Sequence, residues 1–197
     1  VTHALDALAI LGCPTVIVPG NHDTLLVDPS FSFDSLPKNV HIFRDALGEL
    51  IVLPELGLCI WGRPVYEHEP SFHPLEGLEP KPDHGWYVAM AHGLFIERST
   101  TQPISITKEE MAQVPRDYLT DGDGLSSPIT WVELARANCD YIALGHVHVF
   151  RDVTQGECPA FYSGAPSGWG NSGAAIVTLD PTHGTSVKHH KLDWFPA

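Results

Sequence analysis

Three short apolar runs in this sequence each stop at a turn that contains histidine. The runs cover residues 15–18, 86–91 and 141–144, and the turns after them are Gly20-Asn21-His22-Asp23, His92-Gly93 and Gly145-His146-Val147-His148. Short apolar runs bounded by glycine are typical of buried strands. Open α/β sheets keep their active sites at the carboxyl ends of parallel strands. The pattern therefore predicts an α/β fold with four imidazoles, one amide and one carboxylate at one edge.

The N-terminal part of the chain predicts a helix, a strand and a hairpin. We expect the helix over residues 1–11, the strand over 40–43, and the hairpin from 50–53 and 58–61. Gly12 ends the helix and Pro14 bars its continuation.

The C-terminal part predicts a second helix and three further strands. Ser127 is expected to cap the helix, with Pro128 at its first position and the end near Asn138. We expect antiparallel strands over residues 160–162, 174–179 and 186–192, with a turn over 180–184. His189 and His190 alternate faces on the last of these strands, so both cannot serve one site.

Two long segments show no regular pattern. Residues 66–86 contain His68, His73 and His84 and read either as a lid or substrate loop or as a solvated surface loop. Residues 94–125 are loop-rich, and Asp121-Gly122-Asp123-Gly124 within them reads as a turn, because it lacks the later ligands of a calcium loop.

The size and charge of the chain limit its function. Its 197 residues fit one domain, 1–197, and it has no apolar run long enough to span a membrane. A formal charge of −13 argues against general affinity for nucleic acids, although it leaves open a nucleic-acid substrate held by metal ions. The four cysteines form no CxxC pair, so we expect small buried hydrophobic residues in a cytoplasmic protein, while the sequence leaves disulfides open.

The histidine turns contain the chemistry of a metal site. Imidazole together with oxygen donors suits Zn, Fe, Mn, Co or Ni. Two histidines separated by one residue, as in His146-Val147-His148, can point to adjacent metals. His22 can ligate a metal or move a proton near neutral pH, and Asp23 can orient its ring. The alternative for Gly20 to Asp23 is an ordinary turn.

The three turns, in this order and spacing, resemble the third, fourth and fifth motifs of the calcineurin-like metallophosphoesterases. The resemblance covers roughly residues 1–169. A segment shortly after the last motif, Ser163-Gly164-Ala165-Pro166, resembles the Tyr-x-Gly-Ser-Pro segment of the SbcD-like DNA repair exonuclease branch.

This resemblance implies an α/β-β/α sandwich and the hydrolysis of phosphodiesters at a dinuclear centre of Mn, Fe or Zn. It implies that Asn21, His92 and His146 bind the second metal, that His148 binds the first, that His22 is the general acid and that Asp23 orients it. Two cations can turn a bridging water into hydroxide and offset the charge that develops on the phosphoryl oxygens. The implied substrate is a phosphate ester, with DNA and a small or cyclic nucleotide as competing alternatives.

The sequence departs from the family pattern at its beginning. The first two motifs, Asp-x-His and Gly-Asp-x-x-Asp, should precede Gly20, and neither occurs in the residues before it. We therefore expect an N-terminally incomplete domain that lacks its first strands, binds metal weakly and hydrolyses little by itself. The strand over 15–18 is expected to have an uncovered edge, which is an aggregation hazard.

Two alternatives come from other functional classes. A non-catalytic scaffold on the same fold would bind a partner protein, as the retromer subunit of this family does, and would usually have altered ligands. An unrelated structural zinc site would need four closed ligands, typically with cysteine. Cys13, Cys59, Cys139 and Cys158 lie far from the histidine turns in sequence.

Overall fold

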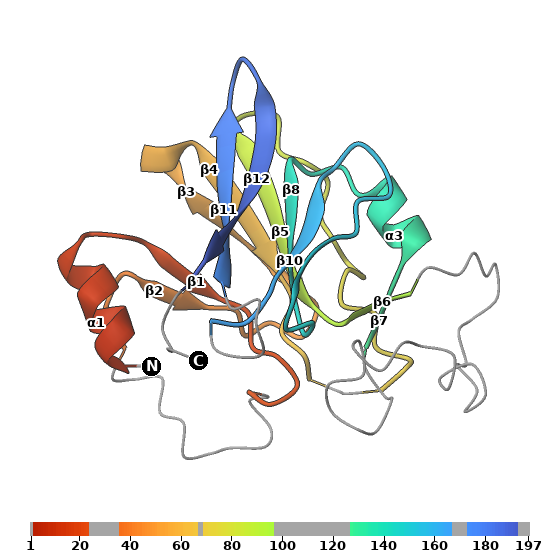
Figure 1. Cartoon of the computed structure of the whole chain (residues 1–197), viewed down its shortest axis with the longest axis horizontal. Helices are drawn as coiled ribbons and strands as arrows, with labels where there is room; N and C mark the ends of the chain where they lie inside the picture. The colour runs from red at the N-terminus through yellow and green to blue at the C-terminus, as the bar shows by residue number, and fades with distance from the viewer. Residues whose placement is uncertain (1, 24–35, 67–68, 97–126, 167–172, 193–197) are drawn as a thin grey trace.

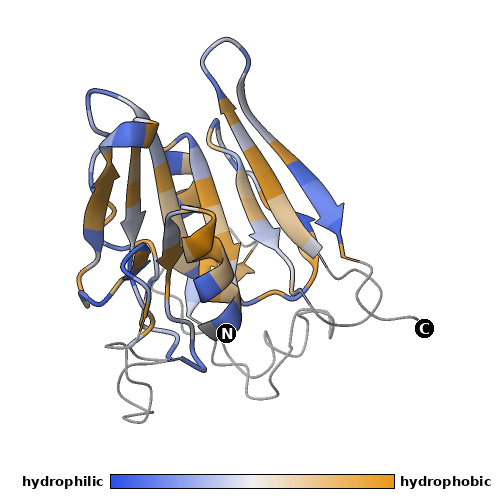
Figure 2. Cartoon of the chain, turned by 90° about the vertical axis from the view of Figure 1, so that its left-hand side faces the viewer, coloured by the Kyte–Doolittle hydropathy of each residue, from blue (hydrophilic) through white to orange (hydrophobic). Residues whose placement is uncertain are grey.

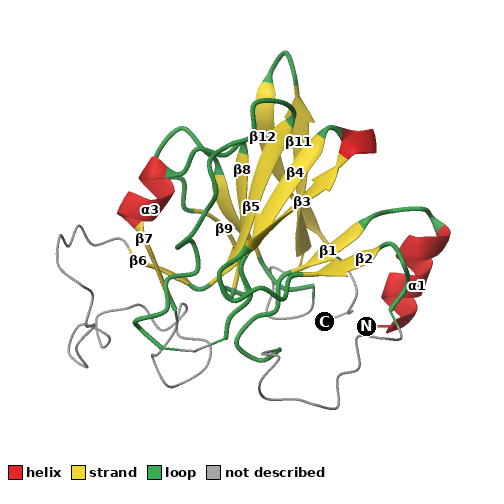
Figure 3. Cartoon of the chain, turned by 180° about the vertical axis from the view of Figure 1, so that it is seen from behind, coloured by secondary structure: helices red, strands yellow, loops and turns green. Residues whose placement is uncertain are grey.

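The structure, a computed structural model, describes residues 2–23, 36–66, 69–96, 127–166 and 173–192. Within them the chain is a mixed α/β protein with more strand than helix, built around one six-stranded sheet (Figures 1 and 3). The α/β class predicted from the sequence is confirmed at this level. Among the described residues, no helix has both the length and the apolar character to cross a membrane.

The central sheet is mostly parallel. Its strands, in spatial order, are β3 (Glu49–Leu53), β4 (Leu58–Gly62), β5 (Trp86–His92), β8 (Tyr141–Gly145), β10 (Ala160–Ser163) and β9 (Phe150–Asp152). The four middle strands run parallel, and the two outer strands are antiparallel to their neighbours. The carboxyl ends of β5 and β8, which carry the second and third histidine turns, therefore lie at the same edge.

The first apolar run belongs to a separate sheet. Strand β1 (Thr15–Ile17) pairs in parallel with β2 (Val40–Ile42), and within the described residues it has no other strand partner. It is half-buried, so the expectation of a buried strand was wrong here. Figures 1 and 3 show this pair and helix α1 (Thr2–Ile10) beside the central sheet.

Helix α1 ends where the sequence predicts. Gly12 adopts the left-handed conformation, with φ of 65°, which glycine reaches without steric cost. The amide of Cys13 donates to the carbonyl of Leu8 at 2.9 Å, and this bond satisfies one of the last helical carbonyls.

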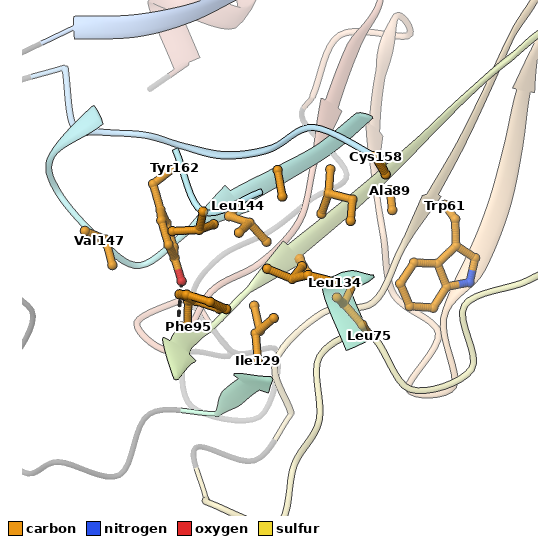
Figure 4. Close-up of a cluster of buried hydrophobic side chains, with 14 of the residues drawn as sticks. Trp61, Leu75, Ala89, Phe95, Ile129, Leu134, Leu144, Val147, Cys158 and Tyr162 are labelled. Atoms are coloured by element: carbon orange, nitrogen blue, oxygen red, sulfur yellow. Dashed lines mark hydrogen bonds between the residues drawn. The ribbon is translucent and has the colours of Figure 1, made fainter. Parts of the chain in front are cut away.

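The hydrophobic core covers one face of the central sheet. Burial alternates along β5, where Tyr87, Ala89 and Ala91 face inward. Figure 4 shows Leu134 and Ile129 packed against this face, and both are fully buried. They come from α3 (Trp131–Arg136) and from β7 (Pro128–Thr130), which pairs in parallel with β6 (Leu94–Ile96). Figure 2 shows that hydrophobic residues make up much of the strands of the sheet.

The predicted start of the second helix was wrong. Residues 128–130 form a strand, and the helix runs only from Trp131 to Arg136. The cap is Thr130, whose side chain accepts from the Glu133 amide while the Glu133 carboxylate accepts from the Thr130 amide. This capping box is the stronger helix-start signal in the segment. Ser127 instead uses its carbonyl to accept a bond from the Leu94 amide at 2.9 Å, which draws the segment toward β6.

The C-terminal strands exist, but their pairing differs in part from the prediction. Strand β10 lies parallel to β8 rather than antiparallel, and its antiparallel partner is β9, which was not predicted. Strands β11 (Gly173–Asp180) and β12 (Gly184–Lys191) form the expected antiparallel pair. The expected turn joins them, and in it the Asp180 carboxylate accepts from the amides of Thr182 and His183 at 2.8 Å.

The hairpin over 50–53 and 58–61 is confirmed as β3 and β4, joined by the short 3-10 helix η2 (Pro54–Leu56). The expected strand over 40–43 is confirmed as β2. The expected loop over 94–125 begins as strand β6, and the rest of it, including the turn at residues 121–124, lies outside the described residues.

Candidate functional site

The end of β1 meets the end of β5 through a side-chain contact. Asn21, in the turn after β1, has its amide oxygen 2.7 Å from Nε2 of His92, the last residue of β5. Gly20 makes this approach possible, because a Cβ atom at that position would lie 2.5 Å from Cε1 of His92. The amide of Val65, which follows β4, also donates to the carbonyl of Pro19 at 3.0 Å. The first histidine turn is thereby attached to the edge of the central sheet.

His146 completes this group from the neighbouring strand. In the β5–β8 register His92 lies opposite Gly145, and the rings of His92 and His146 meet edge to face with centroids 5.3 Å apart. A Cβ atom at Gly145 would lie 2.9 Å from Nδ1 of His92, so glycine is required there as well. We call Asn21, His92 and His146 the edge cluster.

The backbone of His146 is strained. It has φ of 103°, and within the described part of the chain it is the one residue other than glycine with positive φ. Its side chain is buried, with 8% of its surface exposed. Such conformations cost of order 1–3 kcal/mol and cluster at functional sites, because packing must hold them in place. The strained backbone of His146 therefore makes this turn a candidate functional site.

The edge cluster contains an amide oxygen and two imidazoles, which are donor types that divalent metals accept. Two ligands at about 2.1 Å from one ion, at angles between 90° and 109°, lie about 3.0–3.4 Å apart. The 2.7 Å separation of Asn21 Oδ1 and His92 Nε2 is shorter than that range and is the length of a hydrogen bond between the two side chains. All three members of the cluster are neutral donors, however, and the described residues contain no group of three or more His, Cys, Asp or Glu side chains able to hold a metal ion.

The other three predicted site residues are exposed. His22 and Asp23 lie on the turn that carries Asn21, and the amide of Asp23 closes that turn by donating to the carbonyl of Gly20 at 3.0 Å. His148 lies in the loop between β8 and β9. Because no three-residue group of metal-binding side chains is found in the described ranges, His148 does not join His92 and His146 in a histidine cluster here.

Tyr162 supports the edge cluster and was not predicted as a site residue. Its hydroxyl donates to the carbonyl of Gly93 at 2.7 Å. It also accepts from the amide of Phe95 at 2.8 Å, the contact that is dashed in Figure 4. The ring is fully buried, and burial raises the pKa of its phenol well above the usual value. Tyr162 thus fixes the backbone directly after His92. The sequence signal that could have identified Tyr162 is its hydroxyl group, which stands in the mostly apolar strand β10.

Arg63 anchors part of the irregular segment over 66–86. It follows β4, donates from Nη1 to the His73 carbonyl at 2.9 Å, and pairs with Glu76 at 3.2 Å. Its guanidinium lies 4.5 Å from the centre of the Phe72 ring. Nδ1 of His73 lies 3.3 Å from the Glu133 carboxylate. His73 is therefore held by its contacts with Arg63 and Glu133. His84 is exposed, and His68 lies outside the described residues.

The histidines of β12 and the four cysteines were also predicted from the sequence. On β12, His189 stacks on Phe150 with ring centroids 4.6 Å apart while His190 is exposed, so the two do lie on opposite faces as predicted. All four cysteines are free thiols. Cys59 and Cys158 are buried as expected, but Cys13 is exposed, so the prediction was wrong for that residue.

Comparisons with known proteins give no family for this chain. No family model matches the sequence, and no curated protein matches it.

Proposed function

We propose that the edge cluster is part of a metal-dependent phosphoesterase centre that cleaves phosphodiesters. The observation that carries the proposal is the meeting of Asn21, His92 and His146, which come from three separate strand ends. An amide oxygen and two imidazole nitrogens form a donor set that divalent Mn, Fe or Zn accepts. The proposed fold is the metallophosphoesterase sandwich, in a cytoplasmic protein.

The roles of the residues follow from their chemistry. Asn21, His92 and His146 would hold one divalent ion and His148 a second, and the pair of ions would supply charge stabilisation and an activated water. His22 would donate a proton to the leaving alkoxide, which departs poorly without one. Asp23, next to it on the same exposed turn, would favour the imidazolium form of His22 and orient its ring.

The proposed substrate is a phosphate ester reached from solvent. His22, Asp23 and His148 are all exposed, so a substrate has access to them. The formal charge of −13 disfavours a large duplex-binding surface on these residues. A nucleotide or a single-stranded end of DNA fits this charge better than a long duplex.

A metal titration tests the proposal directly. The folded chain is titrated with Mn²⁺ while the ring signals of its histidines are followed by ¹⁵N–¹H NMR. We expect His92 and His146 to broaden before the other rings. His92→Ala should weaken Mn²⁺ binding at least tenfold, whereas His84→Ala, on an exposed loop, should not. Equal binding by wild type and His92→Ala would refute the site.

Turnover is measured on bis(p-nitrophenyl) phosphate with the same samples. Three neutral ligands and one further histidine make a weak donor set, so we expect weak metal binding and little hydrolysis by this chain alone. Tight binding of two ions per chain would contradict this expectation.

A scaffold that binds a partner protein is the second candidate. Ile10 and Leu11 form an adjacent apolar pair at the end of α1, with 86% and 79% of their surfaces exposed. Exposed apolar groups rimmed by polar residues often mark protein contacts. If Mn²⁺ broadens no histidine ring and the chain is inactive, this candidate replaces the enzyme.

A further inference from the structure

Two free cysteines lie just ahead of two neighbouring strands. Cys139 and Cys158 each stand two residues before a strand, β8 and β10 respectively, and these strands pair in parallel with Ala160 opposite Ile142. The amide of Ile142 donates to the carbonyl of Pro159 at 2.8 Å, and the same register, continued back along the chain, places Cys158 opposite Asp140, the residue after Cys139. Neighbouring strands lie about 4.8 Å apart and rise about 3.3 Å per residue, so an offset of one residue puts two Cα atoms about 5.8 Å apart. This spacing is within the roughly 4.4–6.8 Å between Cα atoms that disulfides span.

The two thiols also touch. Their side chains share a hydrogen bond, with Cys139 as donor and Cys158 as acceptor. That bond lowers the pKa of the Cys158 thiol, since it stabilises the thiolate, and the same bond together with burial raises the pKa of Cys139. Asp140 and Lys81, paired at 2.6 Å, act on both thiols in opposite directions: the Asp140 carboxylate raises their pKa, and the Lys81 ammonium lowers it.

We propose that Cys139 and Cys158 form a reversible intramolecular disulfide when the protein meets a peroxide. One of the two sulfurs, as a thiolate, attacks one oxygen of hydrogen peroxide, breaks the O–O bond, and becomes a sulfenic acid while hydroxide leaves and takes up a proton. The other sulfur then attacks the sulfenic sulfur, and the S–O bond breaks with release of water. In total, two thiols and one peroxide give one disulfide and two waters.

The position of this pair connects it to the edge cluster. A disulfide between Cys139 and Cys158 closes a loop that contains β8, His146, His148 and β9. Asp140, next to Cys139, exchanges hydrogen bonds with Tyr87 on β5, one from its amide and one to its carboxylate, both at 2.8 Å. Oxidation would therefore restrain the segment that presents two of the predicted metal ligands. The disulfide itself does not depend on the proposed phosphoesterase function.

The test is oxidation of the folded chain with hydrogen peroxide, in a Cys13→Ser background that removes the exposed thiol. We expect an intact mass lower by two hydrogens, and peptide mapping should find one bond, between residues 139 and 158, that dithiothreitol reverses. Cys59→Ser removes a buried cysteine outside the pair and should leave the bond intact. Cys139→Ser and Cys158→Ser should each prevent it.

Mapping of the Cys13→Ser protein decides the matter even if the Cys139→Ser variant fails to fold. A bond that involves Cys59 would overturn the proposal. So would the absence of any bond under conditions in which wild-type Cys13 is oxidised.

Discussion

Asn21 and His92 stand 71 residues apart in the chain, yet their side chains lie 2.7 Å from each other. This contact joins the turn after β1, in a two-stranded sheet, to the last residue of β5 in the central sheet. It brings the first histidine turn to the edge where the second and third already lie. The predictions below test how this arrangement is held and how stable the surrounding core is.

Replacing Gly20 with alanine should displace the ring of His92. The new methyl group would lie 2.5 Å from Cε1, which no Cβ atom tolerates, so the ring must turn away and lose its bond to Asn21. We expect a loss of about 1–3 kcal/mol in the free energy of unfolding in urea and a shift of the His92 ring signals in NMR.

Gly184→Ala provides the control for this variant. Gly184 lies in an open turn with φ of 75°, so alanine is strained there but meets no neighbour within 4 Å. It should reduce stability by about 1 kcal/mol and leave the His92 signals in place. Unchanged His92 signals in Gly20→Ala would contradict the close packing of Gly20 against the His92 ring.

Tyr162→Phe should destabilise the turn after His92. It removes the hydroxyl that bonds Gly93 and Phe95, and it leaves a carbonyl and an amide without this partner in the interior. Leaving buried polar groups unsatisfied costs about 1–3 kcal/mol. Tyr66→Phe, which removes a hydroxyl that donates to the carbonyl of exposed Arg44, is the matched control and should cost less than 1 kcal/mol. Equal losses in urea denaturation would argue against a special role for Tyr162.

Stability should fall as the pH rises above about 10. Burial raises the pKa of Tyr87 and Tyr162 above the usual value and raises the pKa of Tyr141 to about 12. In the unfolded chain these phenols ionise near pH 10, while in the folded chain they keep their protons, so rising pH favours unfolding. Each contributes a slope of about 1.4 kcal/mol per pH unit in this range.

Urea denaturation between pH 9 and pH 12 measures this slope, and phenolate absorbance follows the ionisation. Tyr141→Phe should make the slope smaller by one tyrosine's share. Phenolate absorbance that rises fully at pH 10 in the folded protein would contradict the burial of these rings.

Thr130→Ala should weaken the start of α3. It removes the side-chain oxygen that caps the Glu133 amide, and such caps are worth about 1 kcal/mol. Thr178→Ala, on an exposed position of β11, serves as the control and should change stability by less than 0.5 kcal/mol. If Thr130→Ala costs no more than Thr178→Ala in urea denaturation, the capping box contributes nothing to stability.

The edge cluster shows how far sequence reasoning reached toward the candidate site. The three histidine turns could be read from local patterns, and the parallel pairing of β5 with β8 places two of them together. The hydrogen bond of Asn21 to His92 could not be read, because it depends on how closely Gly20 packs against a ring from another sheet. The support from Tyr162 could not be read from the sequence either, because its two hydrogen-bond partners, Gly93 and Phe95, are far from it in the chain.

The sequence by itself determined most of the strands and the turns that follow them, because these features arise from neighbouring residues: apolar runs, glycine, proline and capping side chains. It misplaced the helix start at Ser127, where two local signals competed, and it did not predict the short strands β6, β7 and β9. The tertiary structure alone decided three features. Strand β1 pairs with β2 outside the central sheet, β10 runs parallel to β8, and Asn21, His92 and His146 meet at the edge. These outcomes depend on the free energy of burial and hydrogen bonding between segments far apart in the chain. A pattern of neighbouring residues does not contain that information.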